Sequence, residues 1–255
     1  MHATFLGTSG YHPSESRHTT GLALPQAGVL FDAGTGTFRL PQVFGAEKGD
    51  EQPLDVYLTH AHLDHIAGLT YFIVWLEERR IGPVRVFARP EVHQAVDEHL
   101  FSDLIFPVRI GYERFTIDAG DKHTLADGSK LSVRAQPHRG VTLGYRVDTP
   151  AGGSMSFCTD TTADPEDEDA IAFVRGSDVL IHECHFADAE SHLDEVTGHS
   201  SLTKVCRLAA AANVGRLVLT HINPYYDAEH PLDVDSVRDV FAETVVAEDG
   251  LTVRF

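Results

Sequence analysis

Four residues of the types that bind metals stand within six positions of the chain. The segment 58–65 reads LTHAHLDH and follows a short apolar run that predicts a strand. Alternate residues of a strand point to the same side, so His60 and His62 are expected to present both imidazoles on one face. Asp64 and His65 follow in the turn before a helix. Imidazole and carboxylate are common zinc ligands, so the segment predicts a metal site rather than a His-rich surface loop.

Three further candidate ligands stand at the ends of predicted strands. His138 follows the strand-like run 130–135, Asp160 ends the run 155–159, and His221 ends the run 217–220. Ligands at successive strand ends would converge on one edge of a sheet. The alternative for each residue alone is a cap or a hydrogen-bonding group at a strand end.

The secondary structure predicted around these residues changes along the chain, from mostly strands early to helix–strand pairs later. Short apolar runs predict strands early, at 3–6, 21–24, 29–32, 55–59, 84–88 and 155–159, with further strands alternating over 115–149 around a hairpin turn at Asp127-Gly128. Later residues predict helix–strand pairs, with strands at 179–182 and 217–220. Helices are predicted at 66–80, 90–100, 200–213 and 234–245, and from an N-cap at Asp164 to a stop at Gly176. Since no linker divides the chain, we expect a single α/β (α+β) domain over residues 1–255.

Charge and composition exclude several classes of protein. The chain has 255 residues, 38 acidic against 20 basic, and a formal charge of −18, which argues against a broad nucleic-acid footprint. The longest uncharged apolar stretch, 66–76, is too short for a membrane span, and no signal segment opens the chain. Three cysteines without C-x-x-C spacing fit a reducing compartment, so the expected location is cytoplasmic. Histidines outside the motifs are expected on the surface, namely His2, His12, His93, His99, His123, His192 and His230.

The metal-type residues and four other segments together resemble the metallo-β-lactamase-fold hydrolases, and within them the ribonuclease Z branch. The segments are FLGTSG at 5–10, QPH at 136–138 continuing to LGYR at 143–146, HECHF at 182–186, and GHSS at 198–201. In the third segment Cys184 and His185 replace an alanine and a threonine of the family pattern. The resemblance runs from residue 5 to about residue 226.

The resemblance implies a four-layer αβ/βα sandwich with two divalent ions between its sheets. The ions are commonly zinc, with manganese or iron as alternatives. One ion would take His60, His62 and His138. The other would take Asp64, His65 and His221, and Asp160 would bridge the two.

The resemblance also implies a phosphodiesterase in which a metal-bound hydroxide attacks phosphorus. Asp64 would orient the attacking water, His199 would protonate the leaving group, and Glu183 would orient His199. The alternatives are a purely structural place for His199 at a helix N-terminus, before Ser200 as a plausible N-cap, and an unrelated strand-end carboxylate for Glu183. His182 and His185 are expected to pack or to orient other groups rather than to bind metal. No substrate-binding residue is assigned.

One departure from ribonuclease Z concerns the arm that grips tRNA in that branch. It is inserted between the positions matching His138 and Asp160, and here only 21 residues separate them. The missing arm and the negative charge argue against tRNA as partner and favour a small or cyclic phosphodiester, with an RNA 3′ end still open. Tyr225 and Tyr226 follow His221 and either stack on a base or sugar or line a rim.

Other functions remain open at this stage. A thioester or lactone hydrolase on the same scaffold is one alternative, and a catalytically silent metal-binding sensor is another. A di-iron oxidoreductase is disfavoured, because no flavin-binding domain follows. By resemblance alone we expect a homodimer, and the short apolar stretches predict no membrane partner.

Overall fold

Two seven-stranded sheets pack face to face in the computed structural model, which describes residues 1–226, 229 and 231–255. The first sheet has the order β14-β1-β2-β3-β4-β5-β6 and consists of β1 (His2–Gly7), β2 (Gly21–Leu24), β3 (Val29–Phe31), β4 (Gln52–Tyr57), β5 (Ile81–Ala88), β6 (Glu113–Thr116) and β14 (Thr252–Arg254). The second has the order β13-β12-β11-β10-β9-β8-β7 and consists of β7 (Lys122–Thr124), β8 (Lys130–His138), β9 (Gly140–Asp148), β10 (Ser154–Cys158), β11 (Val179–Glu183), β12 (Arg216–Thr220) and β13 (Thr244–Val246).

Aromatic side chains fill the space between the two sheets. Phe31 of the first sheet stacks on Tyr145 of the second at 5.1 Å between ring centroids. The ring centroid of Phe157 lies 5.8 Å from that of Phe31. These residues belong to one buried cluster with aliphatic residues of both sheets. Because the opposite face of each sheet is also covered, the central strands are apolar on both sides, which explains their continuous apolar runs.

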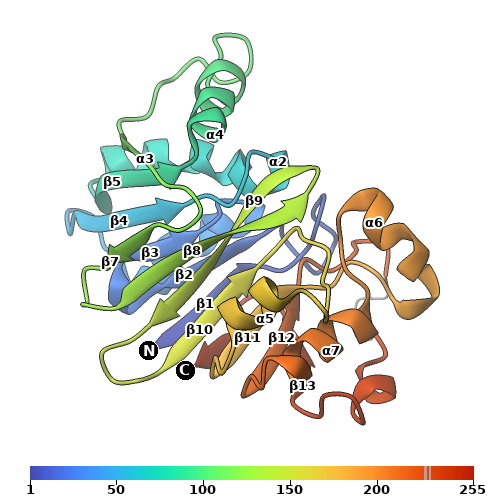
Figure 1. The fold of residues 1–255 in the computed structure, drawn as a ribbon. Helices are drawn as coiled ribbons and strands as arrows, with labels where there is room; N and C mark the ends of the chain where they lie inside the picture. The colour runs from blue at the N-terminus through green and yellow to red at the C-terminus, as the bar shows by residue number, and fades with distance from the viewer. Residues whose placement is uncertain (227–228, 230) are drawn as a thin grey trace.

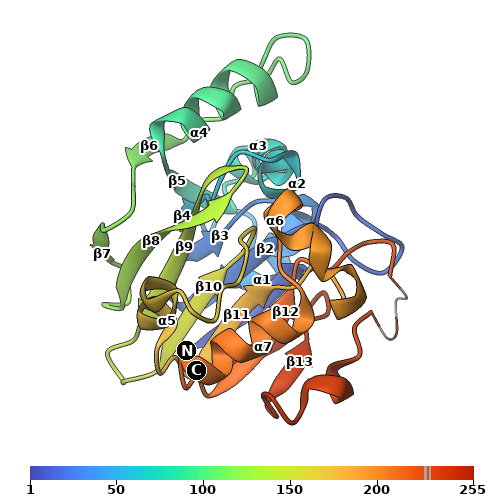
Figure 2. The same cartoon turned by 45° about the vertical axis from the view of Figure 1, so that its right-hand side comes forward.

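Helices cover the outer face of each sheet (Figures 1 and 2). The α-helices are α1 (Leu40–Phe44), α2 (Leu63–Ile66), α3 (Phe72–Glu77), α4 (Pro90–Ala95), α5 (Glu168–Val174), α6 (Asp194–Thr197) and α7 (Leu202–Ala211). A second buried cluster joins β3, β4 and β5 to the helices of residues 40–101, and a third joins β11 and β12 to α5 and α7. The expected four-layer sandwich is confirmed.

Short 3-10 turns connect several of these elements, and a π-helical turn extends α4. The 3-10 turns are η1 (Pro25–Ala27), η2 (Thr35–Arg39), η3 (Ala67–Tyr71), η5 (Asp188–Leu193) and η6 (Val234–Val237), and the π turn is η4 (Val96–Leu100). In both views α4 and the loop after it project from the body of the molecule (Figures 1 and 2).

The two chain ends meet at one end of the sandwich. The amino group of Met1 donates a hydrogen bond to the carbonyl of Phe255 at 3.1 Å. The strand β14 pairs with β1, so the last residues complete the sheet that the first residues begin. Across the described ranges, no helix combines the length and the apolar character that crossing a bilayer requires.

Some predicted elements differ from the observed ones. The helix predicted over 66–80 is divided into α2, η3 and α3, because Gly68 packs against the backbone of Gly34 and donates to the carbonyl of Ala33 at 2.7 Å. The helix predicted from Asp164 begins at Glu168, because the carboxylate of Asp167 accepts the free backbone N–H groups of its first turn.

The helix predicted over 234–245 is wrong. Only the 3-10 turn η6 forms there, and residues 244–246 become β13, which pairs in parallel with β12. These β-branched residues complete the edge of the second sheet, and this pairing overrides their local pattern. The turn at Asp127-Gly128 is confirmed, since it joins β7 to β8.

The surface prediction for His93 is wrong, because its ring is buried and its Nε2 bonds to the carbonyl of Phe115 at 3.0 Å. His230 lies outside the described residues.

Candidate metal centre

The candidate ligands follow strands that end at one edge of the sandwich. His60 to His65 follow β4, His138 ends β8, Asp160 follows β10 and His221 follows β12. The strands β10, β11 and β12 run parallel, so the residues after them emerge at the same edge. Asp160 and His221 have left-handed backbone conformations, with φ of 48° and 54°, so the chain turns sharply where each strand ends.

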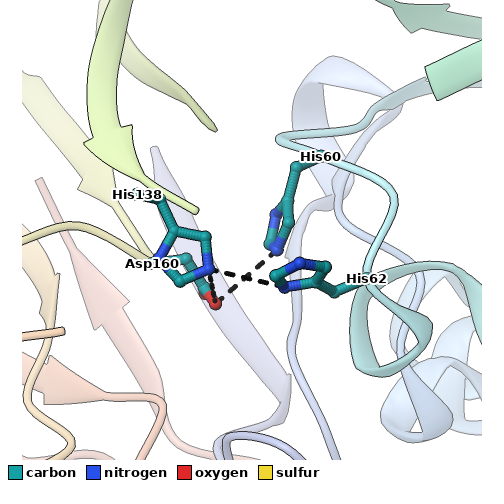
Figure 3. Close-up of side chains that lie close together, drawn as sticks. All are labelled: His60, His62, His138 and Asp160. Carbon is teal, nitrogen blue, oxygen red and sulfur yellow. Dashed lines mark hydrogen bonds and ion pairs between the residues drawn. The ribbon is translucent and has the colours of Figure 1, made fainter. Parts of the chain in front are cut away.

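One group of candidate ligands consists of His60, His62, His138 and Asp160. Their ligand atoms all lie within 4.8 Å of one another. Figure 3 shows the four side chains pointing toward one another. Nε2 of His138 lies 3.4 Å from Nδ1 of His62, and Nε2 of His60 lies 3.6 Å from Oδ2 of Asp160. His62 is exposed while His60 and Asp160 are buried, so the group opens to solvent on one side.

A second group consists of Asp64, His65 and His221, whose ligand atoms also lie within 4.8 Å of one another. Oδ2 of Asp64 is 3.3 Å from Nε2 of both histidines. Asp160 joins the two groups, because its Oδ2 faces His60 and His138 while its Oδ1 lies 3.1 Å from His65 and 3.2 Å from His221. The fold therefore brings all seven candidate ligands together.

The hydrogen bonds of the imidazole rings show that these residues fit a bound cation. Nδ1 of His138 donates to the carbonyl of Gly198 at 2.9 Å, and Nδ1 of His65 bonds to the Asp32 carboxylate at 2.8 Å. Nδ1 of His60 lies 3.0 Å from the Thr59 hydroxyl. In each neutral ring Nε2 then carries a lone pair and faces carboxylate oxygens. Nε2 of His60 and of His65 is buried without a hydrogen bond among the described residues. The Nε2 lone pairs and the carboxylate oxygens repel one another. A cation bound between them would remove this repulsion.

Charge interactions within the cluster favour the same conclusion. Burial alone would raise the pKa of Asp160, but His221, His65 and His60 hold that pKa well below its usual range. Burial alone would lower the pKa of His65, but Asp160, Asp64 and Asp32 hold it well above its usual range. The carboxylates thus create a field that attracts positive charge to the position that Nε2 of His65 faces.

Asp32 supports the site, and the sequence reasoning did not assign it a role. It follows β3, is fully buried, and accepts hydrogen bonds from the backbone N–H of Thr59 at 2.8 Å and from its hydroxyl at 2.9 Å. It therefore fixes both His65 directly and His60 through Thr59. The available signal was an aspartate that ends an apolar strand, the same signal that identified Asp160.

Glu183 and His199 form a pair beside the cluster. Oε1 of Glu183, the last residue of β11, lies 3.0 Å from Nδ1 of His199. The buried Glu183 carboxylate also accepts backbone N–H bonds from Thr161, His185 and Ser200 at 3.1–3.2 Å. It therefore holds three separate segments together as well as orienting His199.

The pair keeps a proton near the cluster. Burial would lower the pKa of His199, but the charge and hydrogen bond of Glu183 raise it to about 9. The N-cap of α7 is Ser201 rather than Ser200, so His199 lies two residues before the cap. A ligand atom of His199 also lies within 4.8 Å of those of Asp160 and His221.

A cavity of about 400 Å³ opens over the cluster. Its walls are formed by Tyr11, His62, Asp64, His138, Arg139, Asp160, His185, Phe186, Thr197, His199 and His221. His185 stacks on His199 at 4.7 Å between centroids, and burial lowers its pKa to about 4, with His221 and His199 adding to the effect. The sequence reasoning gave His185 a packing or orienting role and did not expect it at the cavity wall.

Comparison with known proteins agrees with this fold and site. The β-lactamase superfamily domain matches residues 28–222. Ribonuclease Z of Picosynechococcus sp. is 30% identical over an alignment of 310 positions that covers 99% of this chain and 96% of that protein. The metallo-β-lactamase fold protein YhfI from Bacillus subtilis superposes with a TM-score of 0.77, at 20% identity and 99% coverage of each chain. A diphosphatase from the PhnP family superposes with a TM-score of 0.74, at 20% identity, and covers 100% of this chain and 98% of that one.

Two packed sheets with a His/Asp cluster at their shared edge define a metallo-β-lactamase sandwich. The chain belongs to the metallo-β-lactamase superfamily, as its motifs predicted. Within that superfamily it is a ribonuclease Z-like, metal-dependent hydrolase.

Proposed function

We propose that this hydrolase cleaves phosphodiesters with two divalent metal ions, for which zinc is the expected metal. One ion would be held by His60, His62 and His138, and the other by Asp64, His65 and His221, with Asp160 shared. The observation that carries the proposal is that the two oxygens of Asp160 face different groups of histidines. The ribonuclease Z relative supports a phosphodiester as substrate.

Two cations bound here would polarise the phosphoryl oxygens and a water molecule. The protein's own contribution is to position the reacting groups. Asp64 accepts the backbone N–H of Tyr11 at 2.8 Å and lies at the wall of the cavity, where a carboxylate oxygen can accept a hydrogen bond from the attacking water. Its pKa stays below the usual range because His65 and His221 outweigh the effect of burial, so the carboxylate remains charged.

His199 supplies the proton that the departing alkoxide needs. Its Nδ1 is occupied by Glu183, so Nε2 is free to donate, and the ring forms part of the cavity wall. A general acid placed in this way contributes roughly 10²- to 10⁴-fold to the rate when the leaving group is poor.

The proposal is tested with two substrates that differ in leaving group. In the variant His199→Ala, hydrolysis of a phosphodiester with an alkyl leaving group should fall roughly 10²- to 10⁴-fold, while release of p-nitrophenolate from bis-p-nitrophenyl phosphate should fall much less, because a good leaving group departs without a proton. Metal content, measured by mass spectrometry, should stay at two ions per chain.

Equal losses on both substrates would exclude proton transfer by His199 to the leaving group. Loss of metal from His199→Ala would assign His199 to metal binding instead. If the unmodified enzyme hydrolyses neither phosphodiester but does cleave a thioester or a lactone, the substrate class is wrong.

The chain is shorter than its ribonuclease Z relative, and this difference bears on the size of the substrate. The alignment with ribonuclease Z spans 310 positions against 255 residues here, so the relative carries additional segments. Together with the charge of −18, this favours a small or cyclic phosphodiester over tRNA. A panel of cyclic nucleotides, bis-p-nitrophenyl phosphate and a precursor tRNA distinguishes these, and light scattering tests the expected homodimer.

A further inference from the structure

A row of three neighbouring aromatic rings begins at the wall of the cavity. Tyr11 lines the cavity and is 69% exposed, and Tyr225 is 77% exposed. His12 lies between them, with its ring centroid 5.0 Å from that of Tyr11 and 5.2 Å from that of Tyr225. We propose that this aromatic rim, formed by Tyr11, His12 and Tyr225, stacks on the base of a nucleotide whose phosphodiester lies in the cavity. The proposal rests on the proposed function and assigns specificity-determining residues to it.

The two loops that form the rim are joined by backbone hydrogen bonds. The N–H of Gly10 donates to the carbonyl of Ile222 at 3.0 Å, and the N–H of Ile222 donates to the carbonyl of Thr8 at 2.9 Å. The N–H of Tyr11 donates to Oδ2 of Asp64 at 2.8 Å. The rim is therefore fixed relative to the candidate metal ligands, so a stacked base would stand at a defined distance from the phosphodiester.

The backbone of Tyr11 points to a role for its ring. Its φ is 65°, in the left-handed region that favours glycine. A large aromatic residue there is uncommon and is held by the bond to Asp64. Such a conformation is typical of functional positions, because packing alone gives no reason to place an exposed ring there.

The neighbouring Tyr226 shows what a structural tyrosine looks like in the same loop. Its hydroxyl accepts the N–H of Ala187 at 2.9 Å and donates to the carboxylate of Glu190. Among the described residues, the hydroxyls of Tyr11 and Tyr225 have no such partner, and their rings are exposed. The sequence left both tyrosines open as stacking or rim-lining residues. We assign stacking to Tyr225, whereas the bonds of Tyr226 hold it within the fold.

The charges around the cavity favour a short nucleotide. Arg139 is the one Lys or Arg among the described residues that line the cavity, and the whole chain carries −18. A long nucleic acid is bound through many phosphate contacts, which this surface does not offer. Stacking needs no positive charge and accepts any base, because every base has a π face.

The test compares two esters with the same leaving group. The p-nitrophenyl ester of thymidine 5′-phosphate carries a base, and methyl p-nitrophenyl phosphate does not. In Tyr11→Ala and Tyr225→Ala, the ratio of kcat/KM for the thymidine ester to that for the methyl ester should fall roughly 5- to 100-fold, mainly through KM. Tyr11→Phe and Tyr225→Phe retain the rings and should retain the ratio. The control is Phe38→Ala, an exposed aromatic residue that does not line the cavity.

A binding measurement separates this proposal from the activity. The fluorescence of 2-aminopurine riboside 5′-monophosphate should be quenched on binding the metal-loaded protein, and Tyr11→Ala should remove that quenching while Tyr11→Phe keeps it. If both esters are cleaved with a ratio that the alanine variants leave unchanged, the rim proposal is overturned and the phosphodiesterase stands. If neither ester is cleaved and no quenching occurs, both fail. Quenching without cleavage keeps the rim and overturns the activity.

Discussion

At the scale of single residues, the candidate centre depends on side chains that touch no substrate. Asp32 is buried beneath the cluster and sets the orientation of His65, and through Thr59 that of His60. By occupying Nδ1 of His65 it directs the lone pair of Nε2 toward the metal position. Glu183 likewise orients His199 from the other sheet by occupying its Nδ1, but there Nε2 is left to carry a proton.

The role of Asp32 leads to a prediction about metal affinity. The variant Asp32→Asn should bind zinc about 10- to 100-fold more weakly, because the charged partner that orients His65 is lost. Competition with a chromophoric chelator measures this affinity. Asp55→Asn is the matched control, since Asp55 is also buried and pairs with Arg85 at 2.6 Å without contacting the cluster. Equal affinities in both variants and the unmodified protein would show that Asp32 has no part in metal binding.

At the scale of elements, the strands position the candidate ligands at one edge of the sandwich, and the turns after the strands orient their side chains. Asp32, Asp160 and His221 each follow a strand, and each has a left-handed backbone with φ between 48° and 55°. For residues other than glycine this conformation costs about 1–2 kcal/mol, so the surrounding structure must hold it. The backbone bonds between Gly10, Ile222 and Thr8 hold one of these turns beside His221.

Gly10 provides a test of this element. A Cβ at this position would lie 2.4 Å from Nδ1 and 2.5 Å from Cε1 of His221, so Gly10→Ala must displace the ring. We expect bound metal to fall from two ions toward one and phosphodiesterase activity to fall roughly 100-fold, because a misplacement of about 1 Å can cost that much. Metal analysis and kinetics together measure the effect.

The control for Gly10 is Gly111→Ala, because a Cβ at Gly111 would meet nothing within 4 Å. Full metal content in Gly10→Ala would show that His221 does not hold an ion.

At the scale of the whole molecule, the metal centre joins the two sheets. His60 to His65 lie in the loop after β4 and in α2, on the side of the first sheet, whereas His138 ends a strand of the second sheet and Asp160 and His221 follow strands of it. Cations bound here would therefore cross-link both halves of the sandwich at one edge. The aromatic core around Phe31 and Tyr145 already joins them in the middle.

This arrangement predicts how metal removal affects stability. Dialysis against a chelator should lower the melting temperature by several degrees, and zinc should restore it, since a ligand present at 100 times its Kd stabilises the native state by about 2.7 kcal/mol. Calorimetry should show one transition in both forms, because the sheets share a core. An unchanged melting temperature would contradict a metal site at this edge. Two separate transitions would contradict the single domain expected over residues 1–255.

The sequence by itself determined what depends on local order. The spacing of His60, His62, Asp64 and His65 places four candidate ligands within six positions whatever the rest of the chain does. Apolar runs followed by Asp160 and His221 define strands with polar ends. Strand period and turn chemistry act over a few residues, so they can be read without knowing the fold. The resemblance to known motifs supplied the four layers and the role expected for Glu183.

Only the tertiary structure decided which distant groups meet. The contact of Asp32 with His65, the position of His185 at the cavity wall and the rim of Tyr11 and Tyr225 all join segments that local patterns do not connect. Residues 244–246 likewise became a strand because the edge of β12 was available for pairing. The physical reason is the same in each case, since packing of two sheets and pairing at their edges are set by the whole chain and override local preference.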